Sequence, residues 1–155
     1  MTISNFYGPQ FFFLSNFFPS TMVATFNNVN YEFATGEHLF QGAKIFASTW
    51  DEEKKKAWLT ELVNNPDPKK AKYYGRSIQI DRTIWNNMNI NVMRRTQEIK
   101  YQNSELAQQL LATGEEELIE GNTWGDKFWG QVNGVGENHL GKLLMERREK
   151  LTTPV

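Results

Sequence analysis

Cysteine is absent from the 155-residue chain, and so is any long run of apolar residues. Without cysteine, a disulfide scaffold and thiolate chemistry are excluded, and a reducing compartment fits. No apolar run approaches the ~20 residues that a membrane-spanning helix requires. The hydrophobic N-terminus has no basic start and is interrupted by two prolines and a Ser-Asn pair, so it is not expected to be a signal peptide. We therefore expect a cytoplasmic protein with no membrane partner.

The sequence also lacks repeats, linkers and the usual nucleotide-binding signatures. Gly134 and Gly136 resemble the start of a dinucleotide-binding loop, but the third glycine position is occupied by His139. There is no GxxxxGK[ST] and no GxSxG motif. A metal site built from His38, His139 and two neighbouring glutamates is conceivable, but it matches no standard ligand spacing. We therefore predict one domain over residues 1–155, with no metal and no cofactor.

Aromatic residues and basic charge are both unevenly distributed. Aromatic residues make up 14% of the chain, so some rings can serve as stacking surfaces. The net charge is −1, yet residues 69–100 hold eight basic residues against two acidic ones, a local charge of +6. A basic region in an acidic protein favours a small anionic ligand over a broad nucleic-acid footprint. The alternative is a solvated helix surface.

The N-terminal third predicts a small antiparallel sheet that leads into a helix. The runs 11–14, 22–26 and 29–33 are strand candidates, and Asn27-Asn28 suits a tight hairpin turn. Thr35 is a candidate N-cap for a helix over residues 36–48. On that helix, one stripe of side chains is polar: Glu37, Gln41 and Lys44. This stripe is either a solvent-facing surface, which is the simpler interpretation, or one side of a polar cleft.

The remaining periodicity predicts four further helices before the C-terminus. They cover residues 51–64, 67–74 with Gly75 as the terminating glycine, 81–101 and 104–112. Their expected buried stripes are Ala57, Trp58, Leu62 and Val63 in the first of these helices, and Ile84, Trp85, Met88 and Val92 in the third. Residues 117–120 suggest a short strand.

The C-terminal region combines a glycine-rich loop with an amphipathic helix. Six of the 11 glycines lie between Gly121 and Gly141, around Trp124, Asp126 and Trp129. Ordering such a loop costs chain entropy, so its shape is expected to matter. From Asn138 the spacing predicts a helix with Leu140, Leu143, Leu144 and Arg147 on one face. Two carboxylates, Glu37 and Asp126, thus lie on elements rich in aromatic residues, which is the usual equipment for glycoside cleavage.

Several motifs in register resemble the NADAR family, the YbiA-like N-glycosidases. They are Phe13-Leu14-Ser15-Asn16-Phe17, Glu37-His38-Leu39-Phe40-Gln41 with Lys44, Asn65-Pro66 with Gly75-Arg76, Trp85, Trp129-Gly130, and Gly136-Glu137-Asn138-His139-Leu140-Gly141 with Leu144–Arg148. The resemblance covers about residues 5–149. It departs from many members at Gln131-Val132-Asn133 and at Gly36, which affects the expected leaving group more than the reaction.

The resemblance implies an α+β, mainly helical domain that hydrolyses N-glycosidic bonds to ribose. Implied substrates are ribosylamino-pyrimidine phosphates of riboflavin synthesis and ADP-ribose joined to nitrogen, including an ADP-ribosylated nucleic acid. Carried over by motif, the catalytic set is Glu37, Trp85, Asp126 and Trp129, and the substrate-binding set is Asn16, Gln41, Lys44, Arg76 and Asn138.

The implied mechanism leaves the two carboxylates open to exchange of roles. Glu37, in the first turn of a helix, suits the stabilisation of an oxocarbenium-like state or the activation of water. Asp126, between two tryptophans, suits the handling of the leaving-group proton. One alternative is a non-catalytic module that sequesters ADP-ribose-like nucleotides. Another is a nucleic-acid-binding protein that uses the +6 region.

Overall fold

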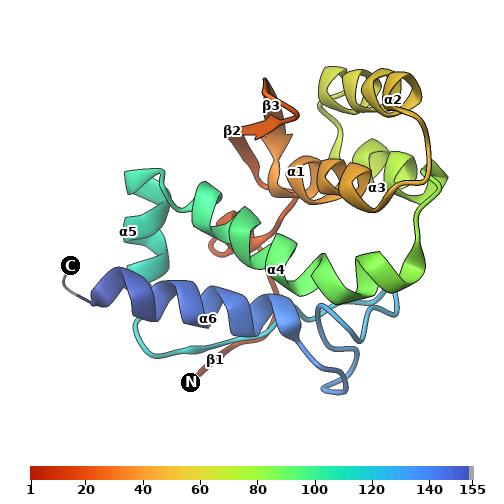
Figure 1. Cartoon of the computed structure of the whole chain (residues 1–155). Helices are drawn as coiled ribbons and strands as arrows, with labels where there is room; N and C mark the ends of the chain where they lie inside the picture. The colour runs from red at the N-terminus through yellow and green to blue at the C-terminus, as the bar shows by residue number, and fades with distance from the viewer. Residues whose placement is uncertain (154–155) are drawn as a thin grey trace. The chain divides into compact units, whose positions relative to one another are not determined.

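The computed structural model of the protein describes residues 1–153 and divides the chain into two compact units. Unit 1 contains residues 1–18 and the chain from residue 97 onward, and unit 2 contains residues 19–96. The elements in chain order, labelled in Figure 1 where space allows, are β1 (Thr2–Ile3), η1 (Phe12–Leu14), β2 (Pro19–Phe26), β3 (Val29–Thr35), α1 (Gly36–Gly42), η2 (Ala43–Ala47), α2 (Glu52–Asn64), α3 (Pro68–Ser77), α4 (Arg82–Lys100), α5 (Ser104–Ala112), β4 (Glu117–Leu118) and α6 (His139–Thr152).

These elements form a mixed α+β fold, as predicted. The expectation of one domain over residues 1–155 stays a prediction, and its last two residues lie outside the described part of the chain. None of the helices described for residues 1–153 is long and apolar enough to cross a membrane.

The predicted hairpin is present in unit 2. Strands β2 and β3 pair antiparallel, with Phe26 opposite Val29. Asn27 and Asn28 form the turn with φ of 52° and 65°, a left-handed conformation that asparagine tolerates better than most residues. Phe33, in β3, is fully buried. The hairpin continues directly into α1, so it fixes where that helix starts.

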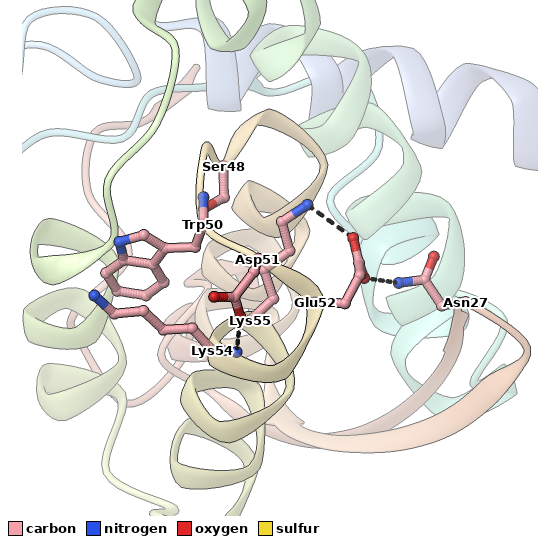
Figure 2. Close-up of polar contacts among 7 residues, drawn as sticks. All are labelled: Asn27, Ser48, Trp50, Asp51, Glu52, Lys54 and Lys55. Carbon is pink, nitrogen blue, oxygen red and sulfur yellow. Dashed lines mark hydrogen bonds and ion pairs between the residues drawn. The ribbon is translucent and has the colours of Figure 1, made fainter.

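Helix α2 begins beside the hairpin turn (Figure 2). The side chain of Asp51 is the N-cap and accepts a hydrogen bond from the Lys54 amide at 2.9 Å. The Glu52 carboxylate accepts hydrogen bonds from Asn27 and from Lys55, each at 3.2 Å. The Lys54 ammonium lies 4.3 Å from the centroid of the Trp50 ring. The start of α2 is therefore a network of charged and polar side chains at the surface.

Several predicted details of the helices and strands are wrong. Residues Phe12–Leu14 form a 3-10 helix and not a strand. Helix α1 ends at Gly42, and Ala43–Ala47 continue as a 3-10 helix. Ala57 is exposed, and Leu59 joins Trp58 and Leu62 as a buried residue of α2. The error in the buried face of α2 arises because local pattern does not determine which neighbouring element covers a given face.

The two chain segments that make up unit 1, residues 1–18 and the chain from residue 97, are joined by strand pairing. Strand β1 pairs parallel with β4, with Ile3 opposite Leu118, and both side chains are buried. Helices α5 and α6 pack against each other, and α6 also contacts β4. Leu140, Leu143 and Leu144 form the buried stripe of α6, as predicted, but the buried arginine is Arg148 and not Arg147. The Arg148 guanidinium donates to Thr113 Oγ1 and to the Glu116 carbonyl, both at 2.8 Å.

Candidate functional site

Two of the three residues of the predicted polar stripe, Glu37 and Gln41, are buried in α1. Thr35 is the N-cap of the helix, because its side chain accepts a hydrogen bond from the His38 amide. Glu37 and Gln41 are each only 7% exposed, and Gln41 Nε2 donates to Glu37 Oε1 at 2.7 Å. The predicted alignment of these residues is confirmed, and the interpretation as a solvent-facing surface is wrong. A buried carboxylate in the first turn of a helix is stabilised in its charged form by the helix dipole.

Lys44, just past the end of α1, joins this stripe to two other helices of unit 2. Its Nζ donates to the Gly75 carbonyl in α3 at 3.1 Å and lies 5.6 Å from the centroid of the Trp85 ring in α4. Burial lowers the Lys44 pKa to about 8; Glu37 opposes this effect, and Arg82 and Arg76 add to it. Three cations and one carboxylate therefore act on one another here. Such a cluster suits an anionic ligand that takes the place of water between the cations.

Gly75 lies inside α3, which continues to Ser77, so the prediction that this glycine ends the helix is wrong. A Cβ at position 75 would stand 1.8 Å from Gln41 Oε1. The glycine therefore permits the close packing of α1 against α3. The glycine is visible in the sequence, but the reason for it is a contact with Gln41, 34 positions earlier.

Trp85 and Phe40 form the apolar part of this cluster. Their ring centroids are 5.3 Å apart with an interplanar angle of 57°, and Trp85 is only 5% exposed. Trp85 therefore contacts both Phe40 and the Lys44 ammonium. Ile84, which was expected beside it in the core, is 48% exposed.

His38 is a structural residue behind the stripe. Its Nε2 lies 2.6 Å from the Asn65 carbonyl, and its Nδ1 lies 2.7 Å from Thr35 Oγ1. Because a carbonyl oxygen can only accept, Nε2 carries the proton and Nδ1 accepts from the hydroxyl. Burial lowers the pKa of His38, which favours this neutral form. Among residues 1–153, no three histidine, aspartate or glutamate side chains gather as metal ligands would.

In unit 1, Asp126 organises the glycine-rich loop. Its Oδ1 accepts from the amides of Phe128 and Trp129 at 3.0 and 2.9 Å. Asn122, 6% exposed, accepts from the Asp126 amide and donates to the Asp126 carbonyl. Asp126 itself is half-buried, and Trp124 is 56% exposed, so Asp126 is not enclosed by two rings as expected. The carboxylate is held rigidly by backbone amides instead.

Two further predicted residues flank this loop. Trp129 is half-buried and packs edge-to-face on Phe128 at 4.8 Å, beside His139. Asn138 is the N-cap of α6 and has a φ of 55°. Its side-chain Oδ1 accepts a hydrogen bond from the Glu120 amide, and its Nδ2 donates to the Leu118 carbonyl, each at 2.9 Å. The structure gives Asn138 a role in holding the loop, and its role in substrate binding stays a prediction.

Asn16 is the remaining predicted binding residue. It is 7% exposed, and its Oδ1 accepts from Gln97 Nε2 at 2.9 Å. The same turn of α4 ends in Lys100, whose Nζ donates to the carbonyls of Phe13 and Ser15 at 2.6 and 2.9 Å. Lys100 is 1% exposed, and burial lowers its pKa to about 7. In the sequence, Lys100 is only one of the eight basic residues of the region 69–100.

The structure thus brings Glu37, Gln41, Lys44, Arg76 and Trp85 together in unit 2, and it places Asn16, Asp126, Trp129 and Asn138 in unit 1. Four residues with a part in these arrangements were not predicted: Arg82, Asn122, Gln97 and Lys100. None of the nine predicted residues lines the hollow of about 720 Å³ described in unit 1, which lies between β1, the segment 9–18 and α5.

Comparison with known proteins gives the family. The NADAR domain matches residues 5–152. The chain belongs to the NADAR family. N-glycosidase YbiA of Escherichia coli (strain K12) is 36% identical over 119 residues, which are 76% of this chain and 69% of that protein. Riboflavin biosynthesis protein VVA0006 of Vibrio vulnificus (strain YJ016) is 34% identical over 142 residues, which are 90% of this chain but 35% of that longer protein.

A solved structure has the same fold. The NMR structure of E. coli YbiA matches this NADAR chain with a TM-score of 0.75 and 33% identity, over 97% of this chain and 84% of the other. The α+β fold of YbiA type is therefore confirmed, and the family is one that contains N-glycosidases.

Proposed function

We propose that this protein hydrolyses the N-glycosidic bond between a phosphorylated ribose and a nitrogenous base. The observation that carries the proposal is the buried Glu37 carboxylate, held by Gln41 in the first turn of α1, with the Lys44 ammonium on the same stripe. Positive charge develops on the ribose as the C1–N bond breaks, and a fixed, desolvated carboxylate stabilises it. Membership of a family whose relatives are named N-glycosidases supports the same reaction.

The cations beside Glu37 favour a substrate with phosphate. Lys44 touches α3 directly before Arg76, and Arg82 acts on Lys44 from the start of α4. A phosphate or diphosphate bound among these groups would hold the ribose near the carboxylate. We propose two substrate classes, ribosylamino-pyrimidine phosphates and ADP-ribose attached to a nucleobase. The name of the Vibrio relative supports the first class.

In the proposed mechanism the two carboxylates have different tasks. Glu37 stabilises the oxocarbenium-like state or activates water, and Asp126 handles the proton of the departing base. Trp129 stacks on the base, while Gln41 keeps Glu37 in place. The substitution Glu37→Gln removes the charge and keeps the shape. We expect it to lower turnover by at least about 10²-fold, the usual cost of losing a group that stabilises charge in the transition state.

Product analysis tests the proposal. The protein is incubated with a ribosylamino-pyrimidine phosphate and, separately, with an ADP-ribosylated nucleobase, and release of ribose phosphate or ADP-ribose is measured. The matched control is Glu53→Gln, because Glu53 holds the same second position in α2 but is exposed. Release that is lost with Glu37→Gln and kept with Glu53→Gln supports the proposal. Ligand that is bound and returned intact would instead identify a sequestering module.

A further inference from the structure

The last turn of α4 holds the segment that carries Asn16. Gln97 and Lys100 lie three positions apart and share a face of the helix. Both are only 1% exposed, and both contact the same short stretch of unit 1. Gln97 Nε2 donates to Asn16 Oδ1, which fixes the direction of the Asn16 amide. The adjoining backbone is held by Lys100.

Lys100 contacts the backbone on either side of position 14, in the turn that precedes Asn16. Its Nζ donates to the carbonyls of Phe13 and Ser15, and Phe18 donates its own amide to the Ser15 carbonyl at 3.1 Å. The ammonium also lies 5.9 Å from the centroid of the Phe18 ring. Ser15 Oγ accepts from the Phe17 amide, which closes the turn on the other side of Asn16. Two residues of one helix turn therefore set both the backbone and the side chain at position 16.

Lysine is a costly choice at such a position. A buried ammonium loses its hydration, and two carbonyl hydrogen bonds replace only part of it. An apolar residue of similar length would bury more readily but could not donate to the two carbonyls. The two donor contacts are therefore what lysine specifically contributes at position 100.

We propose that Lys100 is a positioning residue for substrate binding, acting through Asn16 by fixing the Phe13–Ser15 turn while Gln97 orients the Asn16 amide. The proposal rests on the proposed function in that Asn16 is taken to contact the substrate. Asn16 is expected to contact ground state and transition state alike, so its displacement raises KM and leaves kcat nearly unchanged. A lysine that only supported folding would lower the active fraction, and with it the apparent kcat, at constant KM.

The test is a double-mutant cycle of Lys100→Met and Asn16→Ala, with KM and kcat measured at fixed pH. We expect each single substitution to raise KM by up to about tenfold, the usual effect of a lost hydrogen bond. The double variant should be no worse than Asn16→Ala alone, because Lys100 acts through Asn16. Additive effects in the cycle, or a fall in kcat at unchanged KM, would overturn the proposal.

The matched control is Arg148→Met. Arg148 is another buried cation of unit 1, 8% exposed, that donates to Thr113 and to the Glu116 carbonyl. Its loss removes comparable contacts, so its KM should stay at the wild-type value. A KM increase equal to that of Lys100→Met would mean that any loosening of unit 1 has this effect. If Lys100→Met does not fold, Gln97→Leu replaces it in the cycle, with the same expected coupling to Asn16.

A spectroscopic readout separates this proposal from the proposed function. The side-chain amide signals of Asn16, identified by their loss in Asn16→Ala, are expected to move toward solvent-like shifts in Lys100→Met and to stay in place in Arg148→Met. Unmoved signals would overturn the positioning role even in an active enzyme. If the signals move but the protein cleaves neither substrate, the positioning of Asn16 is supported and the glycosidase activity is rejected. In that case the Kd for ADP-ribose, measured by calorimetric titration, replaces KM in the double-mutant cycle.

Discussion

At the scale of single residues, the candidate site depends on side chains that are buried or half-buried and that have specific polar partners. Glu37 has an amide partner, Lys44 has a carbonyl and a ring, and Lys100 has two carbonyls. Each of these side chains is held in one place by its contacts. Substitutions that move a partner should therefore affect function before they affect stability.

Gly75→Ala tests this at the contact between α1 and α3. The new Cβ would stand 1.8 Å from Gln41 Oε1, so the Gln41 side chain must move and release Glu37. The end of a side chain can move, and alanine gains about 0.5–1 kcal/mol over glycine within a helix. We expect urea unfolding to show a stability within about 1 kcal/mol of wild type, while turnover falls clearly. Gly8→Ala, where a Cβ meets no atom within 4 Å, is the control and should leave turnover unchanged.

Lys100 should give the protein a characteristic pH dependence of stability. Burial lowers its folded-state pKa to about 7, below the ordinary value of 10.5 for lysine, so the unfolded chain binds more protons between these two pH values. Stability therefore rises with pH from about 7, by about 1 kcal/mol between pH 7 and 8. The lowered pKa of Lys44 also makes stability rise with pH, but this contribution begins at about pH 8. Urea unfolding at pH 7 and 8 should show the rise in wild type and a clearly smaller one in Lys100→Met; equal slopes would contradict the assignment.

At the scale of elements, two local features that the sequence predicted are confirmed. The Asn27-Asn28 turn and the Thr35 cap depend on residues within four positions of each other, so their chemistry is visible in the sequence. Strand β1 was missed because its partner β4 lies more than 100 residues away. Gly75 was misassigned because its contact with Gln41 is tertiary. The sequence pattern thus predicts where the helices lie, whereas contacts between residues far apart in the chain determine which helix residues are buried.

The glycine-rich loop is an element whose shape and chemistry can be separated by substitution. Asp126 Oδ1 accepts two backbone amide hydrogen bonds, and an asparagine oxygen can accept the same two. Asp126→Asn should therefore fold with stability within about 0.5 kcal/mol of wild type, whereas Asp126→Ala should lose about 1–2 kcal/mol. If Asp126 handles the leaving-group proton, both variants lose turnover. Full turnover by Asp126→Asn would leave the residue with a loop-holding role alone.

For the whole molecule, the placement of charge bears on the choice of ligand. The chain has a net charge of −1, and its largest basic excess, +6, lies in residues 69–100. One of those eight basic residues, Lys100, is buried and has a lowered pKa, so it adds little to the surface. Arg76 and Arg82 are exposed and act on the half-buried Lys44. Lys44, Arg76 and Arg82 therefore form a small cationic group, which favours a compact anion over a long nucleic-acid backbone.

Salt dependence of binding distinguishes these two ligand classes. Affinity for DNA falls with salt in proportion to the number of phosphates neutralised, and a protein making 6–10 such contacts loses about 10³–10⁵ in affinity between 50 and 200 mM salt. A phosphorylated ribosyl ligand held by Lys44, Arg76 and Arg82 would engage two or three cations, so its affinity should fall by about 50-fold at most over the same range. Calorimetric titrations with ADP-ribose and with unmodified duplex DNA at both salt concentrations provide the measurement. Tight, steeply salt-dependent binding of the unmodified DNA, with no binding of ADP-ribose, would assign the basic region to nucleic acid and remove the phosphate-binding role from these three residues.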